Sequence, residues 1–225
     1  MHNLCLIKNS DMTLQPIEGE IFAVDKPLGW SSFHVVKKLR GALLSRLRAT
    51  GVRKLKVGHA GTLDPLATGV MIVCTGKATR RIEELQSGVK EYVATVALGA
   101  TTPSFDLETP IDATYPTAHI TRDLVEEVLS RFKGRIEQVP PSYSACKVDG
   151  HRAYKMARRG EEVDLKPKIL VIDEMELLEF SPEEIVIRVV CSKGTYIRAL
   201  ARDIGAALNL SLIHISEPTR RRGIS

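Results

Sequence analysis

The stretch GHAGTLDPLATGV, from Gly58 to Val70, constrains the fold most strongly, because it joins a flexible polar half directly to the apolar run MIVC. The first half holds His59 and Asp64 among small residues and a proline, a composition unsuited to a core strand. The second half is too apolar for a surface loop. We therefore interpret the first half as an active-site loop and the second half as the strand that holds it.

Length and composition limit the number of domains and the kinds of protein that the chain can be. A chain of 225 residues that is 44% hydrophobic fits one globular domain, with or without appendages. No window approaches eighteen apolar residues, so we expect no membrane span, and the N-terminus lacks the pattern of a secretory signal. The cysteines lie far apart and form no CxxC pair: Cys5, Cys74, Cys146 and Cys191. This spacing predicts reduced thiols in a cytoplasmic protein and no zinc site.

The charge is positive and unevenly distributed. The chain carries a formal net charge of +5 with a pI of about 9.0, which favours a polyanionic partner. Five cations directly precede the opening stretch: Arg46, Arg48, Arg53, Lys54 and Lys56. A second run, HRAYKMARRG, covers His151 to Gly160. A solvated face would explain either run alone, but two runs, one beside a candidate active site, favour phosphate contacts.

Apolar periodicity predicts the secondary structure. Strands are expected over residues 21–25, 70–75, 90–98, 169–180 and 184–191, and a further short strand follows the loop that begins at Val139. A helix capped by Ser31 or Ser32 should bury a stripe of Phe33, Val36, Leu39, Leu43 and Leu47. Further helices are expected from Thr121 to Gly134, in the basic run before Gly160, and over 196–208.

These elements predict an α+β fold, with a largely antiparallel mixed sheet flanked by helices. Strands predominate, their connections mix hairpins and helices, and no βαβ rhythm repeats along the chain.

Asp64 is the residue whose chemistry we weigh first. Standing alone, LDP would most simply be a turn with a capping aspartate. One His and one Asp are too few for metal hydrolysis, and no second carboxylate is placed for glycosidase chemistry. The stretch does not match a phosphate-binding GxxxxGK[ST] loop either. A lone carboxylate acting as a nucleophile remains.

Five motifs together resemble the TruB family of tRNA pseudouridine synthases. They run in the family's order from about Glu20 to Leu208. The motifs read VDKPLGWSSFHVV, VGHAGTLDPLATGVMIV, KEYVATVALG, QVPPSYSACKVDGHRAYKMAR and CSKGTYIRALARDIG. The resemblance implies a pseudouridine-synthase-like catalytic domain. It also implies isomerisation of a uridine, in which the N-glycosidic bond breaks and the base reattaches through carbon.

The resemblance assigns roles to single residues. Asp64 matches the catalytic nucleophile, and Arg198 matches the arginine that pairs with it and keeps the carboxylate ionised. Whether the aspartate attacks the ribose or the uracil ring stays open. The alternative is that Arg198 is an exposed residue on a helix face with no role in the site.

Further residues match the family's substrate contacts. Tyr92 matches a tyrosine that lies against the uracil, with a core aromatic as the alternative, and Tyr196 matches a second pocket tyrosine. His59 matches a histidine that meets the RNA where the target base has left the stack, with a satisfied loop histidine as the alternative. Lys26 and Lys147 match motif positions and are expected to support the substrate site and the RNA backbone.

The resemblance implies the T-arm loop of tRNA at nucleotide 55 as the substrate. This substrate suits sequence-specific RNA recognition, which favours loops with splayed bases. The alternatives are a non-catalytic module that binds or folds RNA, and the same chemistry on another RNA. The reaction involves neither redox change nor hydrolysis, so no cofactor and no metal are expected. We expect a monomer without an obligate protein partner.

The chain also departs from the family pattern. Pro103 stands where the family often has an acid, although Asp106 still matches the acid that closes that run. We expect residues 1–18 to be an N-terminal extension and 19–210 a C-terminally truncated catalytic domain. The tail, residues 211–225, matches nothing in the family and resembles translated adapter sequence. We expect it to be an artefact that is either poorly ordered or loosely docked.

Overall fold

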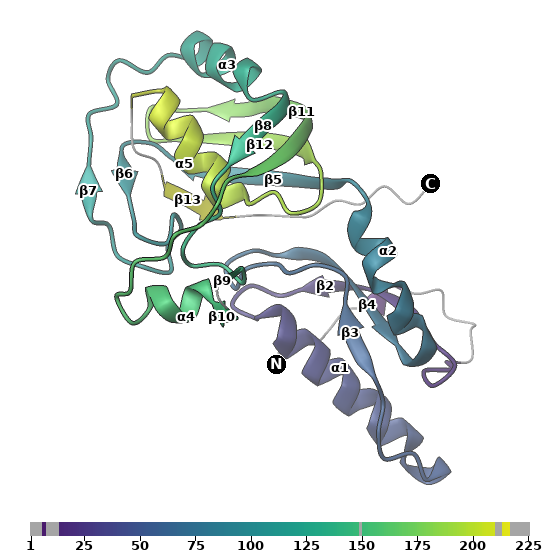
Figure 1. The fold of residues 1–225 in the computed structure, drawn as a ribbon. Coiled ribbons are helices and arrows are strands. Elements are labelled where there is room, and N and C mark those ends of the chain that lie inside the picture. The colour runs from purple at the N-terminus through teal and green to yellow at the C-terminus, as the bar shows by residue number, and fades with distance from the viewer. Residues whose placement is uncertain (1–5, 8–13, 149, 210–212, 217–225) are drawn as a thin grey trace. The chain divides into compact units, whose positions relative to one another are not determined.

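A computed structural model of the chain describes residues 6–7, 14–148, 150–209 and 213–216. The described residues divide into two compact units (Figure 1), one up to Gly88 and one from Val89 onward. The division falls inside the segment 19–210 that the sequence analysis treats as one domain. Each unit has its own sheet and its own helices.

The first unit is built on a four-stranded antiparallel sheet with the order β1-β2-β4-β3. The strands are β1 Leu6–Ile7, β2 Ile21–Lys26, β3 Val57–His59 and β4 Gly69–Thr75. In the central pair, Phe22 lies opposite Val73 and Val24 opposite Met71, and all four side chains are buried. The expected strands at 21–25 and 70–75 are confirmed, because alternating apolar residues give each strand one core-facing side.

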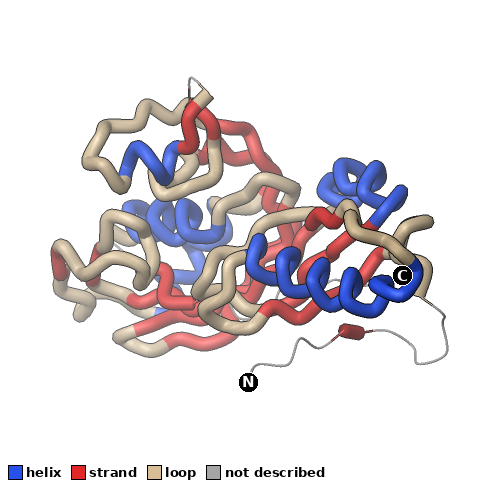
Figure 2. Tube along the Cα trace, turned by 90° about the horizontal axis from the view of Figure 1, so that it is seen from below, coloured by secondary structure: helices blue, strands red, loops and turns tan. Residues whose placement is uncertain are grey.

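Helix α1, Ser32–Leu47, is the longest helix that the structure describes and lies against the strands of its unit (Figure 2). Ser31 caps it by accepting a hydrogen bond from the His34 backbone N–H at 3.1 Å. The buried side of α1 consists of Ser32, Val35, Val36, Leu39 and Leu43. The expected stripe was wrong at Phe33, which is 64% exposed. With 3.6 residues per turn, Val35 shares a face with Leu39 and Leu43, whereas Phe33 does not.

Short helical segments complete the first unit. Segment η1, Arg48–Thr50, follows α1 and ends at Gly51 in the left-handed region. Segment η2, Gly76–Arg81, and helix α2, Ile82–Ser87, follow β4 and were not predicted from the sequence. Both are too short for an apolar periodicity to register.

The second unit holds a five-stranded antiparallel sheet with the order β13-β5-β12-β11-β8. Its long strands are β5 Lys90–Ala97, β11 Lys168–Phe180 and β12 Glu184–Cys191, as expected from the sequence. Strand β8, Gly134–Gln138, was not predicted, because its pattern GRIEQ carries a single apolar residue. Two small hairpins pair β6 Ala100–Thr101 with β7 Ala113–Thr114, and β9 Lys147–Val148 with β10 His151–Arg152.

The two faces of this sheet differ in character. One face is apolar, because Tyr92, Ala94 and Val96 on β5 lie opposite Val189, Ile187 and Ile185 on β12, and all six are buried. The other face carries a charged cluster in which Arg188 pairs with Glu91 at 3.0 Å and Glu174 at 2.6 Å. An antiparallel sheet with one face in the core and one in water shows this alternation.

The described part of the second unit contains three helices: α3 Arg122–Arg131, α4 Ala153–Ala157 and α5 Ile197–Ala207. Helix α3 is capped by Thr121, whose side chain accepts from the Leu124 N–H, as the sequence predicts. Helix α5 lies across the sheet (Figure 1) and buries Leu200 and Ile204. Burial of side chains of this size stabilises the fold by about 1.5–3 kcal/mol each.

One expectation about the tail is corrected by the structure. Residues 213–216 form strand β13, Ile213–Ser216, which pairs with the edge of β5 instead of docking loosely. The short alternating stretch IHIS meets an unpaired strand edge, and such an edge is a ready template for pairing. Residues 210–212 and 217–225 lie outside the described part of the chain.

The expected α+β fold with largely antiparallel sheets is confirmed. Every strand pairing between described residues is antiparallel, and helices accompany the sheet in each unit.

Gly99, at the turn after β5, gives a test of this packing. Its φ is +78°, and an added Cβ would lie 2.6 Å from both the Tyr115 carbonyl oxygen and Thr117 Cγ2. Gly160, in the same unit, has φ +73° with nothing within 4 Å of such a Cβ. Gly160→Ala should cost about 1 kcal/mol through the left-handed backbone alone. Gly99→Ala should cost about 1–3 kcal/mol more from overpacking.

Urea unfolding of the two variants measures this difference. Equal losses of stability would show that the turn at Gly99 relaxes around the added methyl group.

Candidate active site

Asp64 sits in a tight turn between β3 and β4 of the first unit. The turn is closed by the Ala67 N–H, which donates to the Asp64 carbonyl oxygen at 3.1 Å. Gly61 and Gly69 flank it with φ of +121° and +110°, values that only glycine adopts without strain. Asp64 itself is half-buried. The glycines of the motif therefore shape the loop.

The residue before Asp64 is fixed by a buried serine at the start of α1. The Ser32 hydroxyl donates to the Leu63 carbonyl oxygen at 2.9 Å and accepts from the Leu63 N–H at 2.9 Å. Ser32 and the Leu63 side chain are both buried. One hydroxyl thus satisfies both backbone groups of Leu63, and removal of it would leave both without that partner.

The residue after Asp64 is fixed by a buried lysine. The Pro65 carbonyl oxygen accepts from Lys26 Nζ at 3.2 Å and from the Gly29 N–H at 2.8 Å. Lys26 is 0% exposed, and its ammonium also donates to the carbonyl oxygens of Pro27 at 3.0 Å and Trp30 at 2.7 Å. A buried charge needs such partners. Lys26 therefore positions the loop, a role that its match to a family motif left unspecified.

His59 ends β3 at the mouth of the same turn. Its Nδ1 donates to the Gly61 carbonyl oxygen at 2.8 Å, which in the neutral ring leaves Nε2 as an acceptor. The ring is half-buried. This hydrogen bond fits the alternative reading, in which His59 is satisfied within its own loop. The bond also fixes the direction of Nε2, and the contact of His59 with RNA stays a prediction.

The basic run forms an exposed edge of the first unit. The side chains of all five predicted residues are exposed: Arg46, Arg48, Arg53, Lys54 and Lys56. Leu55, between Lys54 and Lys56, is buried and anchors the segment. These cations are thus available to a polyanion, although exposure alone also fits a solvated face.

In the second unit, Arg198 on α5 is buried, at 4% exposure. Its guanidinium donates to the Ser104 carbonyl oxygen at 2.9 Å and the Tyr143 carbonyl oxygen at 3.0 Å, and lies 3.5 Å from the Asp106 carboxylate. The reading of Arg198 as an exposed helix-face residue is therefore wrong. A fixed, planar guanidinium in a dry setting suits the recognition of a carboxylate.

The loop that contacts Arg198, residues 104–108, is held by hydrogen bonds among its own polar groups; we call it the Asp106 knot. The Ser104 hydroxyl donates to Asp106 Oδ1 at 2.6 Å, and the Glu108 N–H donates to the same oxygen at 2.9 Å. Phe105 between them has φ +58°, rare for a bulky residue, and the Arg202 guanidinium lies 5.2 Å from its ring centroid. The knot holds Asp106 in place, and Asp106 faces Arg198.

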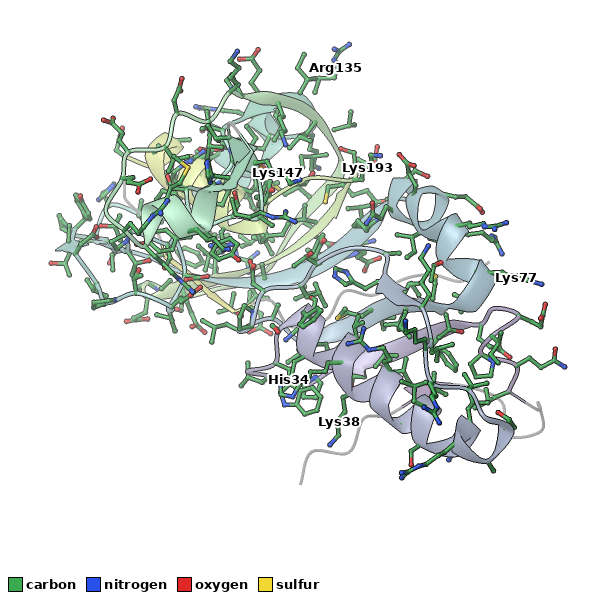
Figure 3. All side chains as sticks on the ribbon, turned by 60° about the horizontal axis from the view of Figure 1, so that its bottom comes forward. His34, Lys38, Lys77, Arg135, Lys147 and Lys193 are labelled. Carbon is green, nitrogen blue, oxygen red and sulfur yellow. The ribbon has the colours of Figure 1, made fainter. Side chains whose placement is uncertain are left out.

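The two predicted tyrosines also belong to this unit. Tyr92 on β5 is buried, so the reading as a core aromatic holds, and its contact with uracil stays a prediction. Tyr196 stands at the start of α5, where buried Gln138 pairs with its backbone. Gln138 Nε2 donates to the Tyr196 carbonyl oxygen at 3.2 Å, and its Oε1 accepts from the Tyr196 N–H at 2.9 Å. The side chain of Lys147 is exposed on β9 (labelled in Figure 3).

Cys146 is a contact of Tyr196 that sequence reasoning missed. Its Sγ lies 3.1 Å from the Tyr196 hydroxyl and 3.7 Å from Lys168 Nζ. Burial raises the pKa of this thiol, but hydrogen bonds with Tyr196 and Ser144 and the charge of Lys168 outweigh it, so that the pKa lies below its usual value. Ser32 and Gln138 were missed as well, because no local pattern marks the partner of a distant backbone.

The structure thus assembles two sets of predicted residues. The first unit brings together Asp64, His59 and Lys26, and the second brings together Tyr196, Arg198 and Asp106. The pairing of Asp64 with Arg198 stays a prediction. Within the described residues, no three His, Cys, Asp or Glu side chains gather as a metal site requires. None of the described helices combines the length and apolar character needed to cross a bilayer.

Comparison with known proteins decides the family. Residues 48–197 match the model of "TruB family pseudouridylate synthase (N terminal domain)". The chain belongs to this family. The matched region includes the Asp64 turn, Tyr92, the Asp106 knot, and Tyr196 up to the first residue of α5. The family is one of isomerases, and the chain is an enzyme of that kind.

Relatives with high identity support the same assignment. The chain is 69% identical over 205 residues to "tRNA pseudouridine synthase B" of Phocaeicola vulgatus, covering 91% of this chain and 86% of the relative. The protein of the same name from Bacteroides fragilis is 67% identical with the same coverage. Among solved structures, the chain resembles one titled "Crystal Structure of a Cbf5-Nop10-Gar1 Complex", with a TM-score of 0.64 and 27% identity. That match covers 96% of this chain and 55% of the other.

The adjacent serines at the start of α1 give a matched test of the Leu63 anchor. Ser32→Ala should lower the free energy of unfolding by about 1–3 kcal/mol, because two buried backbone groups of Leu63 lose their partner. Ser31→Ala removes only a helix cap and should cost about 1 kcal/mol. Amide hydrogen exchange at Leu63 should speed up in Ser32→Ala alone. Unchanged exchange at Leu63 in that variant would contradict the anchor.

Cysteine alkylation tests the Cys146 environment. A lowered pKa means that thiolate forms at lower pH, so iodoacetamide should modify Cys146 at a lower pH than Cys74, whose pKa is raised by burial. Tyr196→Phe should move the onset for Cys146 to higher pH, because the hydroxyl that stabilises the thiolate is gone. Peptide mass spectrometry across a pH series resolves each cysteine. Earlier modification of Cys74 would overturn this account.

Proposed function

We propose that the chain isomerises uridine to pseudouridine in the T-arm loop of tRNA, at nucleotide 55. The observation that carries the proposal is Asp64 in a turn whose two neighbours are anchored by buried side chains, within a chain that is 69% identical to a relative named tRNA pseudouridine synthase B. A rigidly presented carboxylate is what a nucleophile requires.

The reaction rearranges bonds without consuming a co-substrate. The bond between the ribose and the uracil nitrogen breaks, a bond from the same ribose carbon to a ring carbon forms, and that carbon gives up a proton while the nitrogen gains one. Atoms and electrons balance with no oxidant, reductant or water. Asp64 carries the intermediate as the nucleophile, and its attack on either the ribose or the ring fits this balance.

Arg198 is proposed as the partner of the Asp64 carboxylate. Support comes from its burial and from the two carbonyl oxygens that hold its guanidinium plane, at 2.9 Å from Ser104 and 3.0 Å from Tyr143. A cation held in this way keeps a nearby carboxylate ionised. Tyr92, Tyr196 and His59 are proposed to receive the flipped uridine, since a base inside folded RNA must leave its stack to react.

The exposed cations are proposed to bind the RNA backbone. Arg46, Arg48, Arg53, Lys54 and Lys56 are exposed on the first unit, and Lys147 on the second. Cations that neutralise phosphates release counterions, which makes binding strong and sensitive to salt. With tRNA as its partner, the enzyme is proposed to act as a monomer in the cytoplasm.

Asp64→Asn tests the chemistry. The amide keeps the size and much of the hydrogen bonding of the carboxylate but is not a nucleophile, so pseudouridine formation should fall by roughly 10⁴-fold or more. Binding of tRNA should survive, because a negative charge near phosphates is removed. A single-turnover assay on unmodified tRNA transcript with mapping of the product, and filter binding in parallel, measure both.

Controls separate the alternatives. Arg198→Lys should also be damaging, because lysine cannot reproduce a two-pronged contact with a carboxylate. Near wild-type isomerisation by Asp64→Asn would refute the nucleophile. Tight binding by the wild type without any pseudouridine would favour a non-catalytic RNA-binding module, and product at another nucleotide or only in another RNA would correct the substrate.

A further inference from the structure

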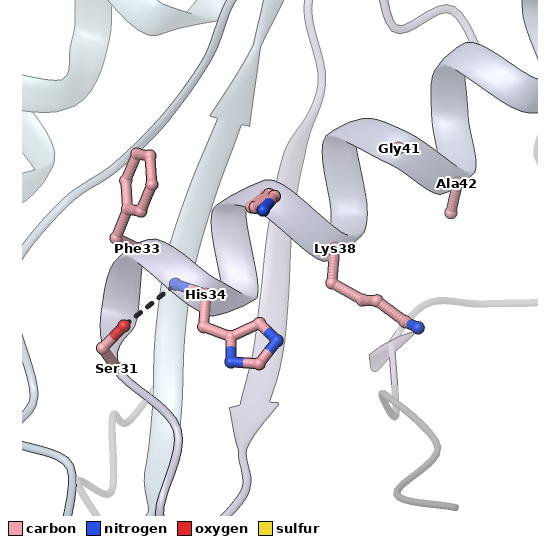
Figure 4. A pocket seen from close by; sticks show the side chains of 7 residues that line it. Ser31, Phe33, His34, Lys38, Gly41 and Ala42 are labelled. Carbon is pink, nitrogen blue, oxygen red and sulfur yellow. Dashed lines mark hydrogen bonds between the residues drawn. The ribbon is translucent and has the colours of Figure 1, made fainter.

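The solvent-facing side of α1 carries an open hollow of about 700 Å³, comparable to the volumes of ligand pockets. Seven residues line it, all from the helix cap or the helix up to Ala42: Ser31, Phe33, His34, Lys37, Lys38, Gly41 and Ala42. Figure 4 shows the two aromatic side chains at the start of α1 and Lys38 farther along it. No residue proposed for catalysis or substrate contact belongs to this set.

The lining has a regular order along the helix. Residues four apart lie on one face, so the hollow consists of two neighbouring rows, Phe33-Lys37-Gly41 and His34-Lys38-Ala42. Each row reads aromatic, lysine, small residue. The buried side of α1 is made by other residues, so this arrangement is not needed to pack the helix.

The aromatic end of the hollow offers ring faces to solvent. Phe33 is 64% exposed, unusual for a phenylalanine beside a well-packed helix face. The exposed His34 ring is stacked on Trp30, with centroids 4.2 Å apart and planes 6° apart. A flat stacked pair and an exposed ring are surfaces on which nucleobases stack.

The charged residues of the segment that contains α1 are all basic. Residues 26–63 contain nine Lys and Arg and no Asp or Glu, although the whole chain carries a net charge of only +5. Lys37 and Lys38 therefore have no acidic neighbour on their own helix. The positive potential of these side chains favours binding of a polyanion over binding of a protein surface that carries charges of both signs. A lipid surface would require a broad apolar face, whereas Phe33 is the single large aliphatic or phenyl side chain among the lining residues.

We propose that this face of α1, which we call the α1 face (Phe33, His34, Lys37, Lys38), binds an unpaired stretch of the substrate RNA. Bases stack on Phe33 and on the His34–Trp30 pair, and Lys37 and Lys38 contact the phosphates. A duplex would present phosphates but not base faces, so single-stranded nucleotides fit better. The inference rests on the proposed RNA substrate and adds a contact separate from the residues around Asp64.

The test uses the full chain and a fluorescent oligouridine as the probe. Phe33→Ala should weaken binding about tenfold, as loss of a stacking platform does, and Phe33→Trp should retain it. Lys37→Gln with Lys38→Gln should lessen the slope of log K against log salt by about 0.7 for each lost phosphate contact. Lys77→Gln is the matched control: Lys77 is an exposed lysine of the same unit, away from α1 and paired with Glu18 (Figure 3).

Several outcomes decide the proposal. Equal binding by wild type and Phe33→Ala would overturn it, and so would lysine variants that behave like Lys77→Gln. Weaker binding of inorganic polyphosphate in the lysine variants, with no effect of Phe33→Ala on oligouridine, would reduce the α1 face to a site for charge alone and refute stacking.

Activity assays keep this proposal apart from the proposed function. With tRNA transcript, the α1-face variants should need more RNA to reach half-maximal rate, while the single-turnover rate at saturation stays near wild type. Wild-type protein that makes no pseudouridine in tRNA would defeat the proposed function, whereas oligouridine binding would still decide the α1 face.

Discussion

The site in the first unit depends on how the chain around Asp64 is anchored. A lysine ammonium without access to solvent holds three carbonyl oxygens, those of Pro27, Trp30 and Pro65, and so joins the turn before α1 to the turn that carries Asp64. Ser32 makes a second connection between the same two segments through Leu63. A buried charge and a buried hydroxyl are costly unless every partner is in place, so these contacts tolerate few alternative arrangements. The aspartate is therefore presented by a backbone fixed on both sides.

In the second unit, a buried glutamine anchors the backbone next to a proposed site residue. Gln138 pairs with both backbone groups of Tyr196 and thereby fixes the start of α5, two residues before Arg198. The Asp106 knot then receives the guanidinium. In both units, a buried polar side chain from one segment hydrogen-bonds to the backbone of a distant segment. That backbone lies close in sequence to a proposed functional residue. Such supporting contacts restrict the positions of these side chains, as the proposed catalytic roles require.

In the first unit, basic side chains occur both in the interior beside the Asp64 turn and on the exposed surface. All charged side chains from Lys26 to Leu63 are Lys or Arg. Lys26 is buried against backbone carbonyl oxygens, whereas Lys37, Lys38 and the five cations of the basic run are exposed. One stretch of the chain thus supplies both an internal anchor and the exposed cations proposed to attract a polyanion. Burial decides which task each cation has, because an ammonium surrounded by carbonyls cannot reach a phosphate.

The sequence by itself determined the family and the order of the main strands and helices, and it predicted Asp64 and Arg198 as site residues. Those features rest on local patterns: apolar periodicity, capping residues, and motifs read within a few positions. The tertiary structure alone decided that Phe33 faces solvent, that β8 and β13 join the sheet, that Arg198 is buried, and that Lys26, Ser32, Gln138 and Cys146 contact the residues they do. Each of these depends on a partner some thirty or more residues away, or on which helix face meets a sheet. No local pattern encodes such a partner, since the free energy of the contact exists only once the chain has folded.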